Sequence, residues 1–536
     1  MISFKRLYKS YICVIMVFAT LAFMTAHPVR AAKAMTDIRV GLVELYGDRD
    51  KITVYNNYLA FGYSVNNSYK AIATLTGDNG FTFSPASGYF CVSNDSYKSF
   101  AEAKKAAGKF KKKGVSAYPA ILGPEEYKVY VQSGSEEEAK KDREKCKDVK
   151  GGLAAPSNSN SERVKAVSTD FEFVIDASKM KAYPQFKAVT SKGASTFVNL
   201  GTRKYRGRIE IGRYGKKGVS AVNVINIEAY LCSVVPCEMV SSWHKEALKA
   251  QAVVARSFCL ASAGYGCDSD IKTPYKIVDT TASQVYKGVN YETKNTTDAV
   301  LATKGELVRY NGNVLKTYFF STSGGATEDG SNVWDLTLPC YKGVPDIYET
   351  SPEKAPWLVK TTLSEIGKKM RDAGYDVGNV KNVYNKIRTK AGRNLVFAVK
   401  DEEKTVNVER GKIRSVLGLY STKIKIVKPK AKPDTVYAKS RTKNTEIGLS
   451  NSYMLQAGGK VTKGSDTGLE QYIVMGSDNM MNFGAKAPKE KGEVYIYGMG
   501  YGHGVGLSQS GARGMAEEGF SYKKIVEYYF TGAVCG

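Results

Sequence analysis

The sequence predicts an α+β fold, in which a larger C-terminal domain of mixed strands and helices follows a smaller α+β domain. Apolar and polar residues alternate in Ile38–Leu42 and Tyr69–Ala73, as is typical of strands. Apolar residues recur every three or four positions in Tyr97–Phe110 and His244–Ala263, as is typical of helices. The length of 536 residues is sufficient for two to four domains.

The N-terminus has the layout of an export signal. Basic residues come first (Lys5, Arg6 and Lys9), an apolar run extends over Tyr11–Ala26, and small residues surround Val29–Ala31. We therefore interpret residues 1–32 as a signal peptide, cleaved after Ala31 or Ala32, or as an uncleaved N-terminal anchor. The protein is expected to be exported, to the cell wall or to the outer face of the cytoplasmic membrane.

Residues 33–150 form the predicted N-terminal domain. Its second half reads as a helix over Tyr97–Phe110, a strand near Gly114–Tyr118, a strand over Tyr127–Gln132 and then Ser135–Ala139. This order resembles a SPOR repeat, a module whose ligand is peptidoglycan glycan without its peptides. The alternative is an α+β segment with no specialised function.

Composition indicates a linker over residues 151–169, since Gly151–Ser161 is rich in glycine, serine and asparagine. The predicted second domain covers residues 170–536. We expect strands at Phe171–Ile175, Arg208–Ile211, Ala221–Ile225 and Thr317–Phe320. The basic segment from Lys423 to Pro433 begins like a strand and ends like a solvated connection.

The charge and the cysteines restrict the partners and the chemistry. The formal net charge is +26, and without the four basic leader residues it is +22. A basic, exported protein is better suited to an anionic wall polymer than to nucleic acid. Eight of the nine cysteines follow the leader, so disulfides are allowed, although their connectivity cannot be deduced. The absence of a Cys-x-x-Cys pair argues against a redox centre or a zinc ribbon.

Glu238 is the main candidate for catalysis. It stands between Pro236-Cys237 and Met239-Val240, and an apolar setting raises the pKa of a carboxyl group, as a general acid requires. The next helix is expected to begin near Ser241-Ser242, with Gln251 and Arg256 as polar interruptions of its apolar surface. The alternative is that Glu238 is a carboxylate stabilised by the nearby helix N-terminus.

A glycine-rich loop with a histidine lies near the C-terminus. In Tyr497–Ala512, glycines alternate with larger residues, and His503 is one of two histidines outside the leader. The spacing fits neither phosphate-binding glycine motif, so the simplest alternative is a strand-to-helix turn. An isolated carboxylate together with a distant Gly-His-Gly loop is also what a sugar-binding cleft assembled from loops requires.

Several motifs in the same order resemble the SpoIID/LytB family. They are Val234–Met239 with Glu246–Arg256, Asp279–Thr281, Gln284–Gly288, Phe320–Gly325, Arg414–Ser421, and Tyr501–Gln509 with Gly511-Ala512. The resemblance covers the chain from about Asp170 to its end. It implies a peptidoglycan lytic transglycosylase that cuts denuded glycan, with Glu238 as the catalytic residue. It also leaves open a non-catalytic wall-binding enhancer of a separate amidase.

The resemblance also suggests substrate contacts and partners. We expect Gln251, Arg256, Ser323, His503 and Gln509 to contact the glycan or to position Glu238. No cofactor is expected, and the partners are peptidoglycan glycan strands and an amidase or another wall hydrolase. A metalloprotease is disfavoured because no His-Glu-x-x-His is present.

Zinc is expected to be absent from a loop where some relatives hold it. Those relatives carry Cys-Asp-Thr-Thr-His-Cys, whereas this chain has Val278, Ala282 and Ser283 at the three ligand positions. Valine and alanine cannot bind zinc, and a neutral serine is a poor ligand. Cys267 and Asp268 could supply at most part of a ligand shell, so packing or a disulfide should hold this loop.

Overall fold

A computed structural model describes residues 37–427, apart from residues 66–67, 159–161, 170, 179, 181–182, 264–271 and 350–355, together with residues 492–536. For residues 428–491 it describes the backbone of six short strands, β26 to β31. The predicted leader, Cys267, Asp268 and the segment from Lys428 to Pro433 lie outside the described residues. Of the described helices, none combines the length and apolarity needed to cross a membrane.

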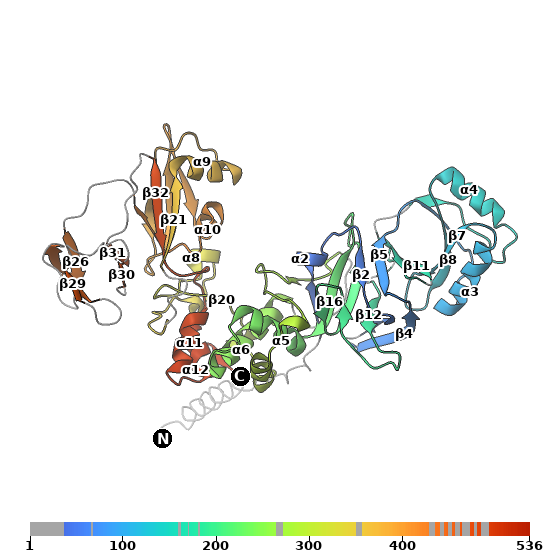
Figure 1. Cartoon of the computed structure of the whole chain (residues 1–536), viewed down its shortest axis with the longest axis horizontal. Helices are drawn as coiled ribbons and strands as arrows, with labels where there is room; N and C mark the ends of the chain where they lie inside the picture. Colours follow the sequence, from blue (N-terminus) through green and yellow to red (C-terminus); the bar gives the residue numbers. More distant parts are fainter. Residues whose placement is uncertain are drawn as a thin grey trace, which may run out of the picture.

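The predicted α+β class is confirmed, because the chain contains both helices and several separate sheets. Figure 1 shows these parts along the long axis of the molecule. A two-helix and sheet region lies at one end (α3, α4, β7, β8), a second sheet with β16 lies beside it, and the helices α5 and α6 follow. A further β-rich module with α9 and β21 rises from the other end.

A seven-stranded sheet contains strands from both sides of the predicted linker. Its order is β17-β1-β16-β15-β12-β3-β4, and it is antiparallel except for the β1–β17 pair. The strands are β1 (Asp37–Gly41), β3 (Tyr58–Val65), β4 (Ser68–Thr76), β12 (Gln185–Ala188), β15 (Arg208–Gly212), β16 (Ser220–Asn226) and β17 (Ile277–Val278). Residues 37–76 therefore complete a sheet of residues 185–278, and the structure differs here from a boundary at 151–169.

An eight-stranded sheet lies next to it, in the order β2-β5-β10-β11-β7-β8-β6-β9. Its strands are β2 (Ile52–Val54), β5 (Phe81–Pro85), β6 (Tyr89–Val92), β7 (Ser116–Ile121), β8 (Tyr127–Ser133), β9 (Ser157–Asn158), β10 (Arg163–Val167) and β11 (Glu172–Asp176). The second half of the predicted linker is thus the inner strand β10. Val164 and Ala166 of β10 are fully buried, which a solvated linker would not achieve.

The SPOR-like segment has a βαββαβ order within this sheet. Strands β6, β7, β8 and β9 alternate with α3 (Phe100–Lys111) and α4 (Glu136–Lys145), and their spatial order is β7-β8-β6-β9. Ser99 and Ser135 cap the two helices by accepting the N–H groups of Glu102 and Glu138. This order is that of a ferredoxin-like split βαβ unit. The resemblance to a SPOR repeat itself stays a prediction.

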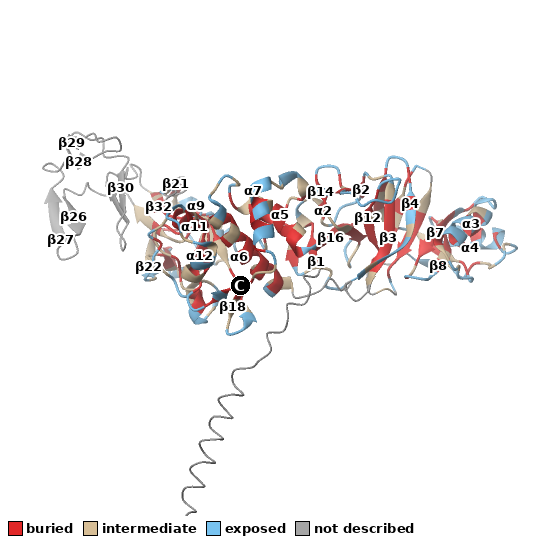
Figure 2. Ribbon diagram, turned by 90° about the horizontal axis from the view of Figure 1, so that it is seen from below, coloured by how far each residue is buried: buried red, intermediate tan, exposed pale blue. Residues whose placement is uncertain are grey.

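Helices carry the candidate site and contribute to two apolar cores, one of which they share with the seven-stranded sheet. They are α5 (Ile227–Glu238), α6 (Lys245–Ala263), α7 (Lys294–Ala302), α11 (Gln509–Glu517) and α12 (Tyr522–Tyr529). Figure 2 shows much of α5 and α6 in the colour of buried residues. Helix α6 begins after His244, whose Nδ1 accepts the N–H of Glu246, and not at Ser241-Ser242 as the sequence suggested.

An inserted module separates the Ser323 motif from the glycine-rich loop and has its own apolar core. Strands β21, β32 and β25 form one of its sheets, and β22, β23 and β24 form the other. The elements are β21 (Trp357–Thr362), α9 (Leu363–Asp372), β22 (Asn382–Arg388), β23 (Asn394–Lys400), β24 (Thr405–Glu409), α10 (Lys412–Leu417), β25 (Ile424–Val427) and β32 (Glu493–Gly498). Because β32 leads directly into the glycine-rich loop, this module lies beside the candidate site.

Short elements complete the described backbone. They are α2 (Val43–Tyr46), β13 (Val198–Asn199), β14 (Lys204–Tyr205), η1 (Val289–Tyr291), β18 (Val308–Tyr310), β19 (Asn313–Val314), β20 (Phe319–Phe320), α8 (Ser331–Trp334), η2 (Pro339–Tyr341), β33 (Leu507–Ser508) and β34 (Val534–Cys535). The strands known by backbone alone are β26 (Thr435–Lys439), β27 (Asn444–Gly448), β28 (Tyr453–Leu455), β29 (Val461–Lys463), β30 (Tyr472–Met475) and β31 (Met480–Phe483). The seven cysteines of the described part are free thiols, so no disulfide is seen among them.

Candidate active site

Glu238 is the last residue of α5, at the edge of a cavity. The helix ends there because Met239 turns to an extended conformation. The side chain is half-buried, and its Oε1 accepts the backbone N–H of Val285 at 3.0 Å. A loop that follows β17 therefore holds the carboxyl group of Glu238 from the side opposite its own helix.

The pKa of Glu238 is raised above the ordinary value of a glutamate, chiefly because burial disfavours the charged form. Hydrogen bonds from the Val285 N–H and from the side chain of Gln509 oppose this effect. The alternative, stabilisation by the N-terminus of the next helix, stays a prediction, and the recorded donors to the Glu238 carboxyl group are the Val285 N–H and the Gln509 side chain. Glu238 lies at the C-terminal end of α5, where the helix dipole disfavours a negative charge.

Gln509 and Gln251 form a chain of amides behind Glu238. Gln509 is the first residue of α11 and contacts Glu238, and its Nε2 donates to Oε1 of Gln251 at 3.4 Å. Gln251 is fully buried in α6 and does not reach the cavity. Of these two predicted site residues, Gln509 lies beside Glu238, and Gln251 accepts a hydrogen bond from Gln509.

The cavity has a volume of about 740 Å³, which lies in the range of ligand sites. It is lined by the end of α5, the loop over Thr281–Ser283, the strand segment Tyr318–Thr322, the start of α11, and Arg414 to Tyr420 of the inserted module. Among the described residues that line it, Glu238 is the only carboxylate. A single acidic group therefore faces a large cleft.

Aromatic rings form two walls of this cavity. Tyr420 and Tyr501 stack at 5.3 Å with 22° between their planes, and both are exposed. Trp334, also exposed, packs against Tyr318 and His503, each at 4.6 Å between ring centroids. Flat, accessible rings of this kind offer apolar faces to a ligand, with polar edges at hand for orientation.

The backbone shape of the glycine-rich loop requires glycine at several positions. Gly500, Gly502, Gly504 and Gly506 have φ values of +74°, +113°, +89° and +80°, which L-residues with a side chain rarely adopt. A Cβ on Gly500 would lie 2.7 Å from the carbonyl oxygen of Thr322. The loop is thus a strand-to-helix turn between β32 and α11, as the simpler alternative proposed, and it also lines the cavity.

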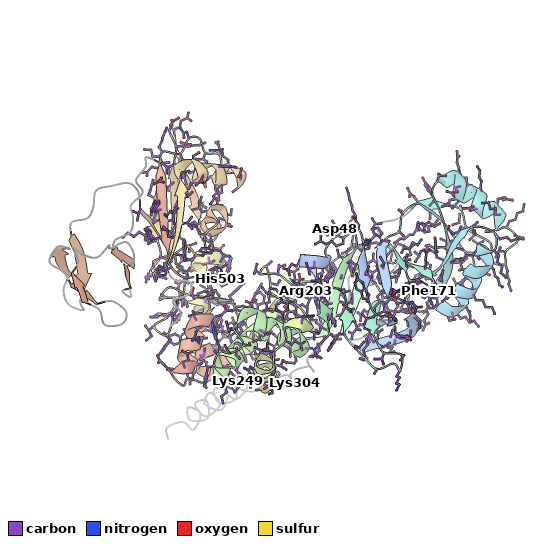
Figure 3. All side chains as sticks on the ribbon, viewed as in Figure 1. Asp48, Phe171, Arg203, Lys249, Lys304 and His503 are labelled. Atoms are coloured by element: carbon purple, nitrogen blue, oxygen red, sulfur yellow. The ribbon has the colours of Figure 1, made fainter. Side chains whose placement is uncertain are left out.

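His503 lines the cavity with its ring but not with a free nitrogen. Its Nδ1 accepts the N–H of Val505 at 3.1 Å, and a hydrogen bond to the backbone of Phe319 occupies the imidazole as well. Burial, with added effects of Arg414 and Arg393, lowers the pKa of His503 to about 3. The neutral imidazole is therefore the form that is favoured at physiological pH. Figure 3 shows it where the inserted module meets the helical core.

Two predicted contact residues lie outside the cavity. Arg256 is fully buried in α6, where Nε and Nη2 donate to Glu228 at 3.0 and 2.7 Å. Its other donors bind the carbonyl oxygens of Val300 and Glu306, so the guanidinium is used inside the core. Ser323 is also fully buried, and its hydroxyl donates to Glu349. The structure therefore does not support either as a substrate contact.

The loop over Val278–Ser283, where the sequence predicts that no zinc binds, is fixed by hydrogen bonds. Ser283 Oγ accepts the N–H of Val278 at 3.1 Å, and the buried Asp279 accepts the N–H of Glu44. Nη1 of Arg203 lies 3.7 Å from the Asp279 carboxylate. Within the described ranges, no cluster of three histidine, cysteine or acidic residues could hold a metal. These contacts tie the Val285 loop to the neighbouring sheet.

We expect chelation to leave the activity of the protein unchanged. The reason is that Asp279, Arg203 and Ser283 hold the loop by hydrogen bonds and charge, so no metal is needed to position Val285. The measurement is the rate of glycan cleavage before and after treatment with a strong chelator and dialysis. Inactivation that zinc alone reverses would show that metal ligands come from elsewhere in the chain.

We expect the rate to fall as pH rises through the pKa of Glu238. The protonated form must donate a proton, and burial keeps that form populated to a higher pH than for an exposed glutamate. A pH profile of kcat/KM between pH 4 and 9 measures this limb. The alkaline limb should move to higher pH in Val285→Pro, because this variant removes an N–H donor that stabilises the charged form of Glu238. A profile that is flat on the alkaline side would contradict Glu238 as the acid.

Sequence reasoning missed the roles of Tyr420, Tyr501 and Arg414. All three stand within motifs that the sequence singled out, Arg414–Ser421 and Tyr501–Gln509, but their meeting across the cleft depends on the inserted module. The available signal was that two motifs far apart in sequence each carried a tyrosine close to glycine, Tyr420 two residues after Gly418 and Tyr501 between Gly500 and Gly502.

Comparison with known proteins confirms the resemblance. Residues 215–310 match the family model SpoIID, described as Stage II sporulation protein, which supports the resemblance to that family. It is 29% identical over 307 residues to the Amidase enhancer of Bacillus subtilis (strain 168), a match that covers 56% of this chain. It is 28% identical over 323 residues to Stage II sporulation protein D of the same organism, covering 58% of this chain and 75% of that protein.

An uncharacterised protein of Brachyspira hyodysenteriae is 29% identical over 311 residues, covering 58% of this chain and 67% of that protein. The chain spans 39% of the length of the Amidase enhancer. The family match includes α5, α6 and the loop that carries Val285, and therefore includes Glu238.

Proposed function

We propose that this protein is a peptidoglycan lytic transglycosylase. It would cleave the bond between N-acetylmuramic acid and N-acetylglucosamine in peptide-free glycan strands. The observation that supports this most directly is that Glu238 is the only carboxylate among the described residues that line a cleft of about 740 Å³. Ordinary glycosidases need a pair of carboxylates, one of which activates water or forms a covalent intermediate. A transglycosylase that uses an internal hydroxyl of its substrate as the nucleophile needs only one carboxyl group.

The reaction uses Glu238 twice. The protonated carboxyl donates its proton to the glycosidic oxygen, and the bond from that oxygen to C1 of the muramic residue breaks. The resulting carboxylate then accepts the proton of the C6 hydroxyl of the same residue, while O6 bonds to C1 and closes a 1,6-anhydro ring. Glu238 returns to its starting form, and no water is consumed.

The surrounding residues prepare Glu238 for both steps. Burial favours the protonated form before the reaction, and the Val285 N–H and Gln509 stabilise the carboxylate once the proton has left. Tyr420, Tyr501 and Trp334 supply ring faces for sugar rings, and Gln251 fixes the amide of Gln509. The neutral His503 shapes the wall without taking part in proton transfer.

Mass spectrometry of the glycan products tests the proposed function. Purified protein without residues 1–32 is incubated with peptide-free glycan strands. Products that end in 1,6-anhydro-N-acetylmuramic acid, 18 Da lighter than the hydrolysis products because one water is missing, are expected. Products with reducing ends would show hydrolysis, and intact strands would show that the cleft does not cut this glycan.

The name of one relative favours a second candidate function. The Bacillus subtilis protein is called an Amidase enhancer, so this chain would then bind the wall and raise the activity of a separate amidase. The two candidates are separated by the same product analysis with no amidase present. A rise in stem-peptide release only when an amidase is added would support the enhancer.

The N-terminal half would support either function by holding the protein on the wall. We propose export to the cell wall, where the high positive charge attracts anionic polymers. The SPOR-like βαββαβ segment would bind peptide-free glycan. Its strands β7 and β8 lie inside the eight-stranded sheet, so point substitutions on the segment are a sounder test than its deletion.

A further inference from the structure

A second cavity of about 560 Å³ adjoins the Glu238 cleft. The two cavities share Trp334, Arg414, Gly502 and His503, so a ligand can extend from one into the other. The second cavity lies between the helical core, which contributes Glu328 and α8, and the inserted module, which contributes β23, β24 and α10. The inserted module therefore adds a further stretch of binding surface to the cleft.

Cationic side chains without partners line this second cavity. Within the described part of the chain, no hydrogen bond or ion pair is recorded for the side chains of Arg414 and Lys412. Arg414 is half-buried and also faces the Glu238 cleft, whereas Lys412 is exposed and lines the second cavity alone. Arg410 differs, because it pairs with Asp335. Arg414 and Lys412 are thus available to an anion.

A buried guanidinium lies in the wall of the same cavity. Arg393 is 1% exposed, and its Nη groups donate only to the carbonyl oxygens of Gly502 and Ser323, at 3.3 and 3.0 Å. Its Nε has no partner, and no ion pair is recorded for it within the described residues. Glu328 and Glu349 favour the charged form of Arg393 through space but form no recorded ion pair with it, and a buried cation without a direct ion pair is costly. An anion in the cavity would reduce that cost.

Within the described residues, the acidic residues of the cavity form no recorded ion pair with Arg393, Arg414 or Lys412, although Glu328 acts on Arg393 through space. Glu328 is buried and already accepts hydrogen bonds from Asn332 and Thr389, and Glu409 is exposed to solvent. The surroundings remain positive enough to affect other groups. Burial, followed by the charge of Arg393, lowers the pKa of Lys423 to about 8.

We propose that this second cavity binds the lactyl carboxylate of a peptide-free N-acetylmuramic acid residue, with Arg414 and Lys412 as its direct partners. The proposal rests on the proposed function, since it concerns the same glycan in the same cleft. When a stem peptide is attached, the lactyl carboxylate becomes a neutral amide. A guanidinium can bind a carboxylate through two parallel hydrogen bonds but gains much less from an amide. The cavity would therefore select glycan from which the peptides have been removed.

Binding by a protein that cannot turn over tests this inference. The full chain carrying Glu238→Gln is measured against peptide-free glycan strands and against the same strands with their carboxylates converted to amides. We expect the strands with free carboxylates to bind about tenfold more tightly than the amidated strands, or tighter still, as is usual for a charge-assisted contact. Adding Arg414→Gln should remove most of that preference and leave binding of the amidated strands unchanged. Arg414→Lys should keep part of it.

Lys412→Gln serves as a second variant, because it lines the second cavity but not the Glu238 cleft. It should reduce the same preference, and its thermal midpoint should equal that of the parent. Equal affinity of the parent for both kinds of strand would overturn the proposal. The proposal would also fail if Arg414→Gln and Lys412→Gln each lowered the affinity for both kinds of strand equally. This comparison of affinities does not depend on the type of reaction, which is determined separately from the masses of the products.

Discussion

Replacing Glu238 with glutamine is expected to abolish the release of 1,6-anhydro-muramyl products. The amide keeps the size of the side chain and can still contact Val285 and Gln509, but it can neither donate nor regain a proton at the pH of the reaction. General acid–base catalysis alone contributes about 10²- to 10⁴-fold to a rate, and here one group performs both steps. The measurement is the initial rate of anhydro-product formation by mass spectrometry.

The matched control is Glu517→Gln, which makes the same chemical change at an exposed position on α11. Glu517 pairs with Arg513 on the surface and does not line the cavity. This variant should retain the full rate, and both variants should keep the wild-type thermal midpoint. Substantial anhydro-product formation by Glu238→Gln would assign the proton transfers to another group.

Replacing Arg256 with methionine is expected to destabilise the fold strongly. The variant leaves Glu228, which is 5% exposed, without the guanidinium that neutralises it. Breaking a buried ion pair by removing one partner typically costs about 3–5 kcal/mol. The measurement is the denaturant midpoint at constant slope. The sequence suggested a substrate contact at Arg256, and that role would leave stability near the wild-type value and raise KM.

Two controls separate these roles. Lys294→Met breaks an exposed pair with Asp298 and should leave the midpoint unchanged. The double variant Arg256→Met with Glu228→Leu removes both buried charges and should recover part of the lost stability. An Arg256→Met protein of normal stability and impaired glycan binding would restore the substrate-contact role.

The sequence identified Glu238 because the relevant information is local. The apolar residues on both sides of it already implied burial, and the structure shows burial as the main cause of its raised pKa. The same reasoning was insufficient for Arg256 and Ser323. A polar residue in an apolar stretch can face a ligand or a buried partner, and the partners Glu228 and Glu349 lie 28 and 26 residues away.

The helices were easier to predict than the partners of the strands. The face of α6 formed by Leu248, Ala252, Ala255 and Cys259 is fully buried or nearly so, as its spacing indicated. The pairing of β1 with β16 has no such signature, because both strands have similar patterns and are separated by some 180 residues. The inserted module was missed as a unit for the same reason: its first strand β21 pairs with β32, which lies on the far side of the segment of residues 428–491.

The position of β1 has a consequence for how the protein matures. This strand lies between β16 and β17, so in the export that we propose the chain presents β1 before either neighbouring strand exists. Such late, long-range pairing slows folding and leaves strand edges open to other chains. Arg39 in the middle of β1 carries a charge that discourages such contacts until Glu210 arrives and pairs with it at 2.6 Å. We therefore expect Arg39→Leu to lower the yield of secreted protein more through aggregation during synthesis than through instability of the finished fold.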